Sequence, residues 1–282
     1  MKYKAFGNTG VEMPVIGQGT WDMPENGPRL DEAKRAIRRG IELGMTHLDS
    51  AEMYGSGRVE ELVGETIRGI ARERLFITTK VMPSNASYEG TLAAAERSLR
   101  RLRCAYLDLY LLHWPGSHPL ENTMRALEAL VEQGKTRFIG VSNFDAAEML
   151  EAASYLDTIP LACNQVLYHL CERGIEHQVI PVARQHGIAI VAYTPFGRGS
   201  FLRASPRRTV LDGVARRLGA TPRQVALAFL TRDANVFTIP KAARVEHVEE
   251  NAAAAALVLE PSDVAEIDAA FSRGTAGPLA TL

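Results

Sequence analysis

Residues 107–113 read Leu-Asp-Leu-Tyr-Leu-Leu-His, a short and almost wholly apolar run that ends in a titratable side chain. Apolar side chains at helical spacing lie on both sides of this run: Leu92, Leu99 and Leu102 before it, and Leu120, Met124, Leu127 and Val131 after it. Strands that alternate with amphipathic helices are the units from which parallel sheets are built. The stretch therefore predicts a β-strand between two helices of an α/β fold.

The same pattern repeats along the chain. Seven further apolar runs predict strands at 15–19, 46–49, 76–80, 138–142, 162–165, 188–193 and 236–240. Eight strands with intervening helices in 282 residues fit a TIM (β/α)8 barrel better than two smaller doubly wound sheets. No linker interrupts the pattern, so we expect one barrel domain over residues 1–282.

Both ends of the chain depart from this repeat. Residues 3–6 and 11–15 flank Gly7-Asn8-Thr9-Gly10, which predicts an N-terminal β-hairpin that plugs the bottom of the barrel. After Pro261, apolar residues at helical spacing predict a C-terminal extra helix outside the barrel. We expect the final dozen residues to be loosely held.

The composition is that of an ordinary globular protein, with 46% hydrophobic and 23% charged residues. Because 32 Lys and Arg balance 33 Asp and Glu, we expect neither nucleic-acid nor membrane binding. No secretory signal and no membrane-spanning run is recognisable, which indicates a cytoplasmic protein, and we expect a monomer. The three cysteines and the remaining histidines lack the spacing of metal ligands, so we predict no metal.

Titratable side chains end three successive predicted strands. Asp49 ends the second strand, Lys80 the third and His113 the fourth, and Tyr54 follows Asp49 closely. Each residue taken alone also fits a structural role, such as a helix cap, a packed aromatic, a surface lysine or a buried histidine. Because catalytic groups of such barrels gather at the carboxyl ends of the strands, the four together predict an active site.

These four groups suit the reduction of a carbonyl. A lysine buried at the barrel mouth needs an anion beside it, and Asp49 is available on the neighbouring strand. A cation about 4 Å from Tyr54 would contribute about 4 kcal/mol at an effective dielectric constant of about 20. We therefore expect Lys80 to lower the pKa of Tyr54 and to make it a general acid, with His113 as a second donor to the same oxygen.

Reduction of a carbonyl also needs a hydride donor, but the sequence contains no Rossmann motif to bind a dinucleotide. Residues 17–22 and 55–60 begin like the GxGxxG fingerprint but lack its third glycine. Other strand ends carry the amides and hydroxyls of Ser142, Asn143, Asn164 and Gln165, which suit a nicotinamide carboxamide, and Tyr193 offers an aromatic face. The glycine-bearing loop 194–200 could hold a pyrophosphate with its backbone N–H groups.

From about Tyr3 to Phe271 the chain resembles the aldo-keto reductase family. The resemblance is carried by eight short matching strings, which are Gly19-Thr20-Trp21, Leu48-Asp49-Ser50-Ala51-Glu52-Met53-Tyr54-Gly55, Thr79-Lys80, Asp108-Leu109-Tyr110-Leu111-Leu112-His113-Trp114-Pro115, Gly140-Val141-Ser142-Asn143-Phe144, Asn164-Gln165, Tyr193-Thr194-Pro195 and Ile239-Pro240-Lys241. Their order at the ends of successive predicted strands is what makes the resemblance specific.

The resemblance implies an NAD(P)H-dependent oxidoreductase with Asp49, Tyr54, Lys80 and His113 as the catalytic tetrad and Tyr54 as the proton donor. Substrate contacts are implied at Trp21, Tyr54, His113 and Trp114. Cofactor contacts are implied at Gly19, Thr20, Asp49, Ser142, Asn143, Gln165, Tyr193, Thr194, Pro195, Phe196, Gly197, Lys241, Ala242, His247, Glu250 and Asn251. The chain looks most similar to short bacterial members that reduce methylglyoxal and other small aldehydes.

Two departures from the family shape further expectations. Residues 116–119 lead almost directly to the next predicted helix, so the lid over the substrate is short and selectivity should be weak. Lys241 matches the lysine that binds the 2′-phosphate, but His247 stands where many NADP-specific members have arginine. We expect NADPH to be preferred over NADH by a smaller margin than in those members.

Two other functions remain open at this point. Lys80 could form a Schiff base as the nucleophile of a barrel lyase, although Asp49 would hold its amine protonated. Alternatively, the chain could be a redox-sensing regulatory subunit with the same fold, which would require an exposed docking surface.

Overall fold

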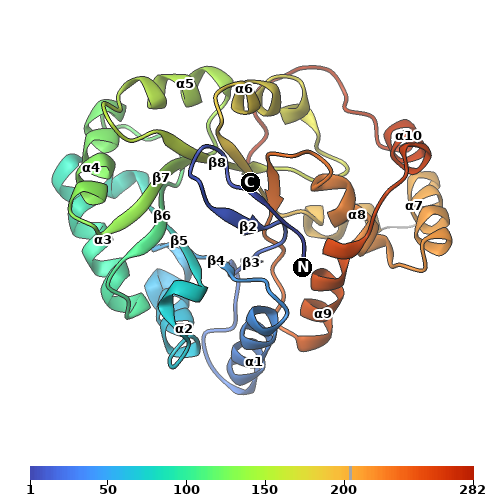
Figure 1. Ribbon diagram of the computed structural model, residues 1–282, viewed down its shortest axis with the longest axis horizontal. Coiled ribbons are helices and arrows are strands. Elements are labelled where there is room, and N and C mark those ends of the chain that lie inside the picture. Colours follow the sequence, from blue (N-terminus) through green and yellow to red (C-terminus); the bar gives the residue numbers. More distant parts are fainter. Residues whose placement is uncertain (203–204) are drawn as a thin grey trace.

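The computed structural model describes residues 1–202 and 205–282 and is built around an eight-stranded parallel sheet (Figure 1). The sheet order is β10-β9-β8-β7-β6-β5-β4-β3, so each strand lies beside its neighbour in the sequence. The strands are β3 (Gln18–Gly19), β4 (His47–Asp49), β5 (Phe76–Val81), β6 (Leu107–Leu112), β7 (Thr136–Ser142), β8 (Leu161–Leu167), β9 (Ala189–Tyr193) and β10 (Val236–Thr238).

The first and last strands of the sheet meet. Parallel bridges join Ile16 to Thr238 and Gly19 to Lys241, and the amide of Gly17 donates to the carbonyl of Thr238 at 2.8 Å. The sheet therefore closes on itself, and the predicted TIM barrel is confirmed.

Alternation along each strand separates the barrel interior from the helical layer. In β6, Leu109 and Leu111 pack inside the barrel, whereas Tyr110 and Leu112 pack against the surrounding helices. Because both faces of these strands are buried, the run at 107–113 is almost wholly apolar.

Ten helices of the described residues surround the sheet (Figure 1). Capping boxes begin α5 at Asp145 and α8 at Thr221. In the described ranges, none of the helices combines the length and the apolar character needed to cross a bilayer. The helices are α1 (Pro28–Glu42), α2 (Arg58–Thr66), α3 (Tyr88–Leu102), α4 (Leu120–Glu132), α5 (Ala146–Ser154), α6 (Val179–Gln185), α7 (Pro206–Arg217), α8 (Pro222–Leu230), α9 (Val245–Ala253) and α10 (Pro261–Ala270).

The predicted hairpin is present as β1 (Tyr3–Ala5) and β2 (Glu12–Pro14), which pair antiparallel. Phe6 enters the barrel and makes edge-to-face contacts with Phe76, at a centroid distance of 5.5 Å, and Phe237, at 5.2 Å. The amide of Asn8 donates to the carbonyl of Gly187 just before β9. The hairpin thus covers the amino ends of the strands and leaves the opposite end open.

The C-terminal extra helix is also confirmed, since α10 buries Ile267 and the chain after it buries Phe271. Most of the last dozen residues are exposed and belong to no helix or strand, as expected for a loosely held segment, but some of them make contacts. Leu279 packs against the hydrophobic core, and Thr281 and Leu282 line a cavity at the open end of the barrel. Contacts far apart in the sequence hold this segment, and no local pattern reveals them.

His47 lies on the inner face of β4 and is fully buried. Its Nε2 atom is 3.0 Å from Thr78 Oγ1, and its Nδ1 atom has no hydrogen-bond partner among the described residues. Burial lowers the pKa of His47 most strongly; the carboxylates of Asp49 and Asp108 oppose this and the Lys80 ammonium adds to it, so that the pKa lies at about 4. The folded protein therefore holds this imidazole neutral.

We expect acidification to destabilise the fold through His47. Between pH 6.5, the ordinary pKa of histidine, and about 4, the unfolded chain binds a proton that the folded chain does not, so stability is lost as the pH falls. Lowering the pH from about 7 to 5 should cost about 2 kcal/mol at this residue. Urea unfolding at both pH values should show a smaller loss for His47→Gln than for the unchanged protein.

Thr78→Val is the matched control, because it removes the hydrogen bond but keeps the titrating imidazole. It should retain the pH dependence of the unchanged protein. Equal pH dependence in His47→Gln and the unchanged protein would contradict the assignment.

Candidate active site

A buried ion pair lies at the carboxyl ends of β4 and β5. Strand alternation turns Asp49 and Lys80 toward the barrel interior, where Lys80 is 0% and Asp49 2% exposed. The Lys80 ammonium lies 2.6 Å from Asp49 Oδ1 and donates to the carbonyl of Ser50 at 2.6 Å. Gln165 Nε2 donates to the other carboxylate oxygen at 2.7 Å. Both carboxylate oxygens are therefore engaged, which is what an isolated buried charge pair requires.

Tyr54 is brought to this pair by a tight turn after β4. The amides of Ser50 and Glu52 continue the pairing with β5, donating to the carbonyls of Thr78 and Lys80. The chain then turns through a short 3-10 helix, Tyr54–Gly57, in which Gly55, Ser56 and Gly57 all have positive φ. Strained backbone of this kind is concentrated at functional sites.

Tyr54 packs beside the Lys80 ammonium, which lies 5.3 Å from the centroid of the tyrosine ring. Burial raises the pKa of Tyr54 above its ordinary value, and the negative charge of Asp49 adds to this, while Lys80 lowers it by less. The expectation that Lys80 makes this phenol unusually acidic is therefore wrong. In the folded chain the carboxylate cancels much of the effect of the ammonium, and desolvation decides the direction.

Lys80 itself stays protonated. Burial alone lowers the pKa of Lys80, but the charge of Asp49 and contacts with Tyr54 outweigh burial, so the pKa lies above its ordinary value. The ammonium can thus stabilise a negative charge that develops on the Tyr54 oxygen.

His113 follows β6 and faces Tyr54, with 5.9 Å between the ring centroids. It is 8% exposed, and its Nδ1 atom has no hydrogen-bond partner among the described side chains and backbone. Burial, helped by the charge of Lys80, lowers the pKa of His113 to about 2. The imidazole is therefore neutral at physiological pH and can donate one hydrogen bond without carrying charge.

Asn143 ties three strand ends together. Its side-chain amide donates to the carbonyl of His113 at 3.0 Å and accepts from the Tyr193 hydroxyl at 2.7 Å. The backbone N–H of Asn143 donates to the carbonyl of Gln165 at 2.9 Å, and the backbone φ angle of Asn143 is 62°. Asparagine tolerates this left-handed conformation better than other residues with a side chain. Asn143 thereby sets the position of His113 relative to β7, β8 and β9.

A cavity of about 710 Å³ opens at this end of the barrel. The residues predicted to contact substrate line it: Trp21, Tyr54, His113 and Trp114. Most residues predicted to contact cofactor line it as well: Gly19, Thr20, Asp49, Ser142, Asn143, Gln165, Tyr193, Thr194, Pro195, Phe196 and Lys241.

The remaining predicted residues lie elsewhere. Lys80 is buried beneath the cavity. Glu250 lies on α9, and its carboxylate accepts a hydrogen bond from the hydroxyl of Thr221, the residue that caps α8, at 2.7 Å. The described residues that line the cavity do not include this group: Gly197, Ala242, His247, Glu250 and Asn251.

Several lining residues were not predicted from the sequence: Asp22, Met53, Pro115, Arg198, Ile239, Thr281 and Leu282. Arg198 lies in the glycine-bearing loop after β9, with its guanidinium 5.1 Å from the centroid of the Trp21 ring. Because this loop was predicted to hold a pyrophosphate, the position of Arg198 within it could have identified the residue from the sequence. Thr281 and Leu282 offered none, because they reach the cavity through a turn of the chain after α10.

The donor set of the cavity fits NADPH, the cofactor that the resemblance implies. Ser142, Asn143 and Gln165 present the hydroxyl and amides that match a carboxamide, beside the half-buried ring of Tyr193. Two cations, Arg198 and Lys241, line the same cavity and suit phosphate groups. Among the residues that the structure covers, no cluster of three or more His, Cys, Asp or Glu is arranged to hold a metal.

Comparison with known proteins agrees with this geometry. Residues 15–271 match the model of the Aldo/keto reductase family. Methylglyoxal reductase YeaE from Escherichia coli is 42% identical over 93% of this chain and 92% of its own length, and glyoxal reductase from Bacillus subtilis is 37% identical over 96% and 94%. A crystal structure of an aldo-keto reductase from Klebsiella pneumoniae in complex with NADPH is 39% identical, with a TM-score of 0.93 over all of both chains. The chain therefore belongs to the aldo/keto reductase family.

Proposed function

We propose that this protein uses NADPH to reduce small aldehydes and α-dicarbonyl compounds such as methylglyoxal to alcohols, with Tyr54 as the proton donor. The observation that carries the proposal is the position of Tyr54, which lines the cavity together with His113 and packs against the buried Lys80 ammonium, 5.3 Å from its ring centroid. The names of the similar reductases support the substrate class.

Each residue has a role in this reaction. His113, as a neutral imidazole, donates a hydrogen bond to the substrate oxygen and polarises the carbonyl. When bound, NADPH supplies the hydride. Tyr54 then gives its proton to the oxygen, and the Lys80 ammonium stabilises the phenolate that is left. Because the pKa of Tyr54 is raised, its hydroxyl is protonated and available at neutral pH.

The side chains that line the cavity indicate how the cofactor would be held. Ser142, Asn143 and Gln165 would hold the carboxamide, and Tyr193 would pack on the nicotinamide ring. The cations that line the cavity would face the phosphates. The short connection from Trp114 to the start of α4 at Leu120 leaves the substrate side with few walls, which favours small substrates.

A Schiff-base lyase is the weaker candidate. Lys80 does not line the cavity, and Asp49 keeps its amine protonated at 2.6 Å. A protonated and enclosed amine cannot attack a carbonyl.

Replacing the proton donor should abolish most turnover. In Tyr54→Phe, kcat for methylglyoxal should fall at least about 100-fold, the lower range of general acid catalysis. NADPH binding, followed by protein fluorescence, should change by less than about twofold because the ring remains. Tyr155→Phe, on the outer layer of helices, is the matched control and should keep full activity. Turnover retained in Tyr54→Phe would show that the donor is another group.

His113 should act without titrating. Because its pKa is about 2, kcat/KM of the unchanged enzyme should show no inflection from this residue between about pH 5.5 and 8. His113→Gln should lower kcat about 100-fold and leave the shape of the profile unaltered. An inflection near pH 6.5 that disappears in His113→Gln would refute a neutral imidazole.

Lys241 should select the phosphorylated cofactor. It lines the cavity beside the Gly19 bridge, where its ammonium is exposed. In Lys241→Met, the KM for NADPH should rise about tenfold, equivalent to about 1.4 kcal/mol, while the KM for NADH stays within about twofold. Lys241→Arg should retain the preference. An equal rise for both cofactors would mean that Lys241 does not contact the 2′-phosphate.

A further inference from the structure

The segment of residues 272–282 returns from the edge of the barrel to the active-site cavity. It leaves α10 on the outside of the barrel and runs back toward the barrel axis (Figure 1). Leu279 packs against the hydrophobic core on the way, and Thr281 and Leu282 line the cavity. Tyr193 lines the same cavity, and its hydroxyl donates to Asn143. The segment therefore forms part of the cavity wall.

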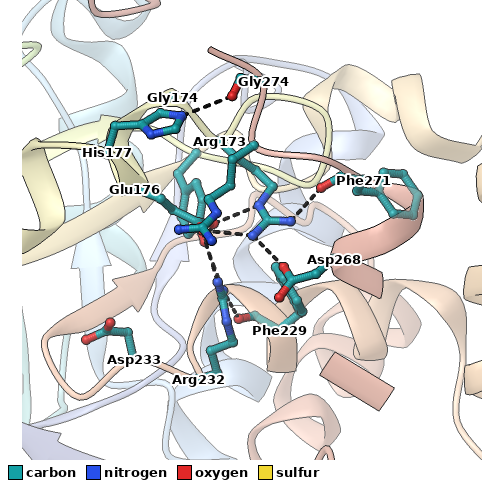
Figure 2. A network of polar contacts seen from close by, with 12 residues as sticks. Arg173, Gly174, Glu176, His177, Phe229, Arg232, Asp233, Asp268, Phe271 and Gly274 are labelled. Carbon is teal, nitrogen blue, oxygen red and sulfur yellow. Dashed lines mark hydrogen bonds and ion pairs between the residues drawn. The ribbon is translucent and has the colours of Figure 1, made fainter. Parts of the chain in front are cut away.

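Arg173 holds the start of this segment. It lies in the loop between β8 and α6 and is 2% exposed. Its guanidinium donates to the carbonyl of Phe271, to Asp268 Oδ1 at 2.6 Å, and to both carboxylate oxygens of Glu176 at 2.7 and 2.8 Å (Figure 2). Arg173 thus joins the loop after β8 to the end of α10 and to the residue that precedes the segment.

Glu176 is the centre of the surrounding charges. Besides the bonds from Arg173, its carboxylate accepts from the Tyr168 hydroxyl at 2.5 Å and lies 3.2 Å from Arg232 and 3.8 Å from Arg273. Burial raises the pKa of Glu176, but the bonds from Arg173 and Tyr168 outweigh it and lower the pKa to about 2. Glu176 is therefore a permanent anion that keeps Arg173 in place.

The loop after β8 holds the segment at a second point. The Nε2 atom of His177 lies 3.2 Å from the carbonyl of Gly274 (Figure 2). The strand that precedes this loop carries Gln165, which bonds to Asp49 in the active site. Strand β8 therefore carries a wall residue of the active site, and the loop that follows it carries the anchor of the segment.

We propose that Arg173 is a positioning residue that fixes segment 272–282 against the cavity and thereby decides which carbonyl substituents the enzyme accepts. The inference rests on the proposed carbonyl reduction. Leu282 and Thr281 add a wall to the cavity, to which the short loop after Trp114 contributes only Pro115. A substrate with an apolar substituent long enough to reach Leu282 uses this wall, whereas methylglyoxal is too small to need it. Releasing the segment should weaken binding of the larger substrate only.

The test uses Asp268→Asn, which weakens the contact between Arg173 and α10 at a partly exposed side chain, and Arg173→Met, which removes the anchor completely. Arg217→Met is the matched control. Arg217 lies at the end of α7 and pairs with two residues of α10, Asp263 at 2.9 Å and Glu266 at 2.6 Å, but it does not contact the segment. Thermal unfolding of all four proteins identifies any variant that fails to fold, and Asp268→Asn then decides alone.

The first readout does not depend on activity. Trypsin cleaves after Arg273, and intact mass identifies the product that has lost residues 274–282. Cleavage should be at least about tenfold faster in Asp268→Asn and Arg173→Met than in the unchanged protein and in Arg217→Met, since proteolysis tracks local opening. Equal cleavage in all four proteins would overturn the anchor.

The second readout compares two aldehydes. In Asp268→Asn and Arg173→Met, KM for 4-nitrobenzaldehyde should rise about tenfold, while kcat for this aldehyde and both constants for methylglyoxal stay within about twofold. Faster cleavage with unchanged constants for both aldehydes would overturn the positioning role. So would an equal loss with both aldehydes, which indicates a general defect of the barrel. If the unchanged protein reduces neither aldehyde, the proposed function fails first, while the trypsin result still judges the anchor.

Discussion

The ion pair between Asp49 and Lys80 is the interaction on which the active site depends. Two charges with almost no exposure to water each cost several kcal/mol to bury, and only their pairing and full hydrogen bonding offset that cost. The partners of the pair come from β4, β5 and β8, because Gln165 and the Ser50 carbonyl complete it. The strands cannot shift relative to one another without leaving a charge unpaired.

The same pair sets the protonation of its neighbours. Lys80 adds to the effect of burial in keeping His47 and His113 neutral, one below the ion pair and one at the cavity. It also faces Tyr54, whose proton is retained because burial and Asp49 oppose the ammonium. A neutral acid and a neutral hydrogen-bond donor therefore lie beside a permanent cation. That arrangement suits a reaction in which negative charge develops on one oxygen.

A second buried cluster, around Arg173 and Glu176, lies in the loop after β8, away from the ion pair. It resembles the first cluster in physical character, since a buried anion and cation are satisfied by several partners each. Such clusters contribute more to a defined geometry than to the free energy of unfolding. In the first cluster that geometry concerns the reacting groups, and in the second it concerns the segment that closes one side of the cavity.

Local patterns in the sequence determined the barrel, because strand and helix periods and their punctuation arise from neighbouring residues. They also placed Asp49, Lys80 and His113 at one rim, since parallel strands share an end. The direction of the pKa shift of Tyr54 could not be read this way, because it depends on how burial and two opposite charges balance in three dimensions. The cavity wall formed by Thr281 and Leu282 was likewise decided only by tertiary structure. A buried arginine more than 90 residues before Phe271 holds that segment, and no spacing along the chain records a contact of this kind.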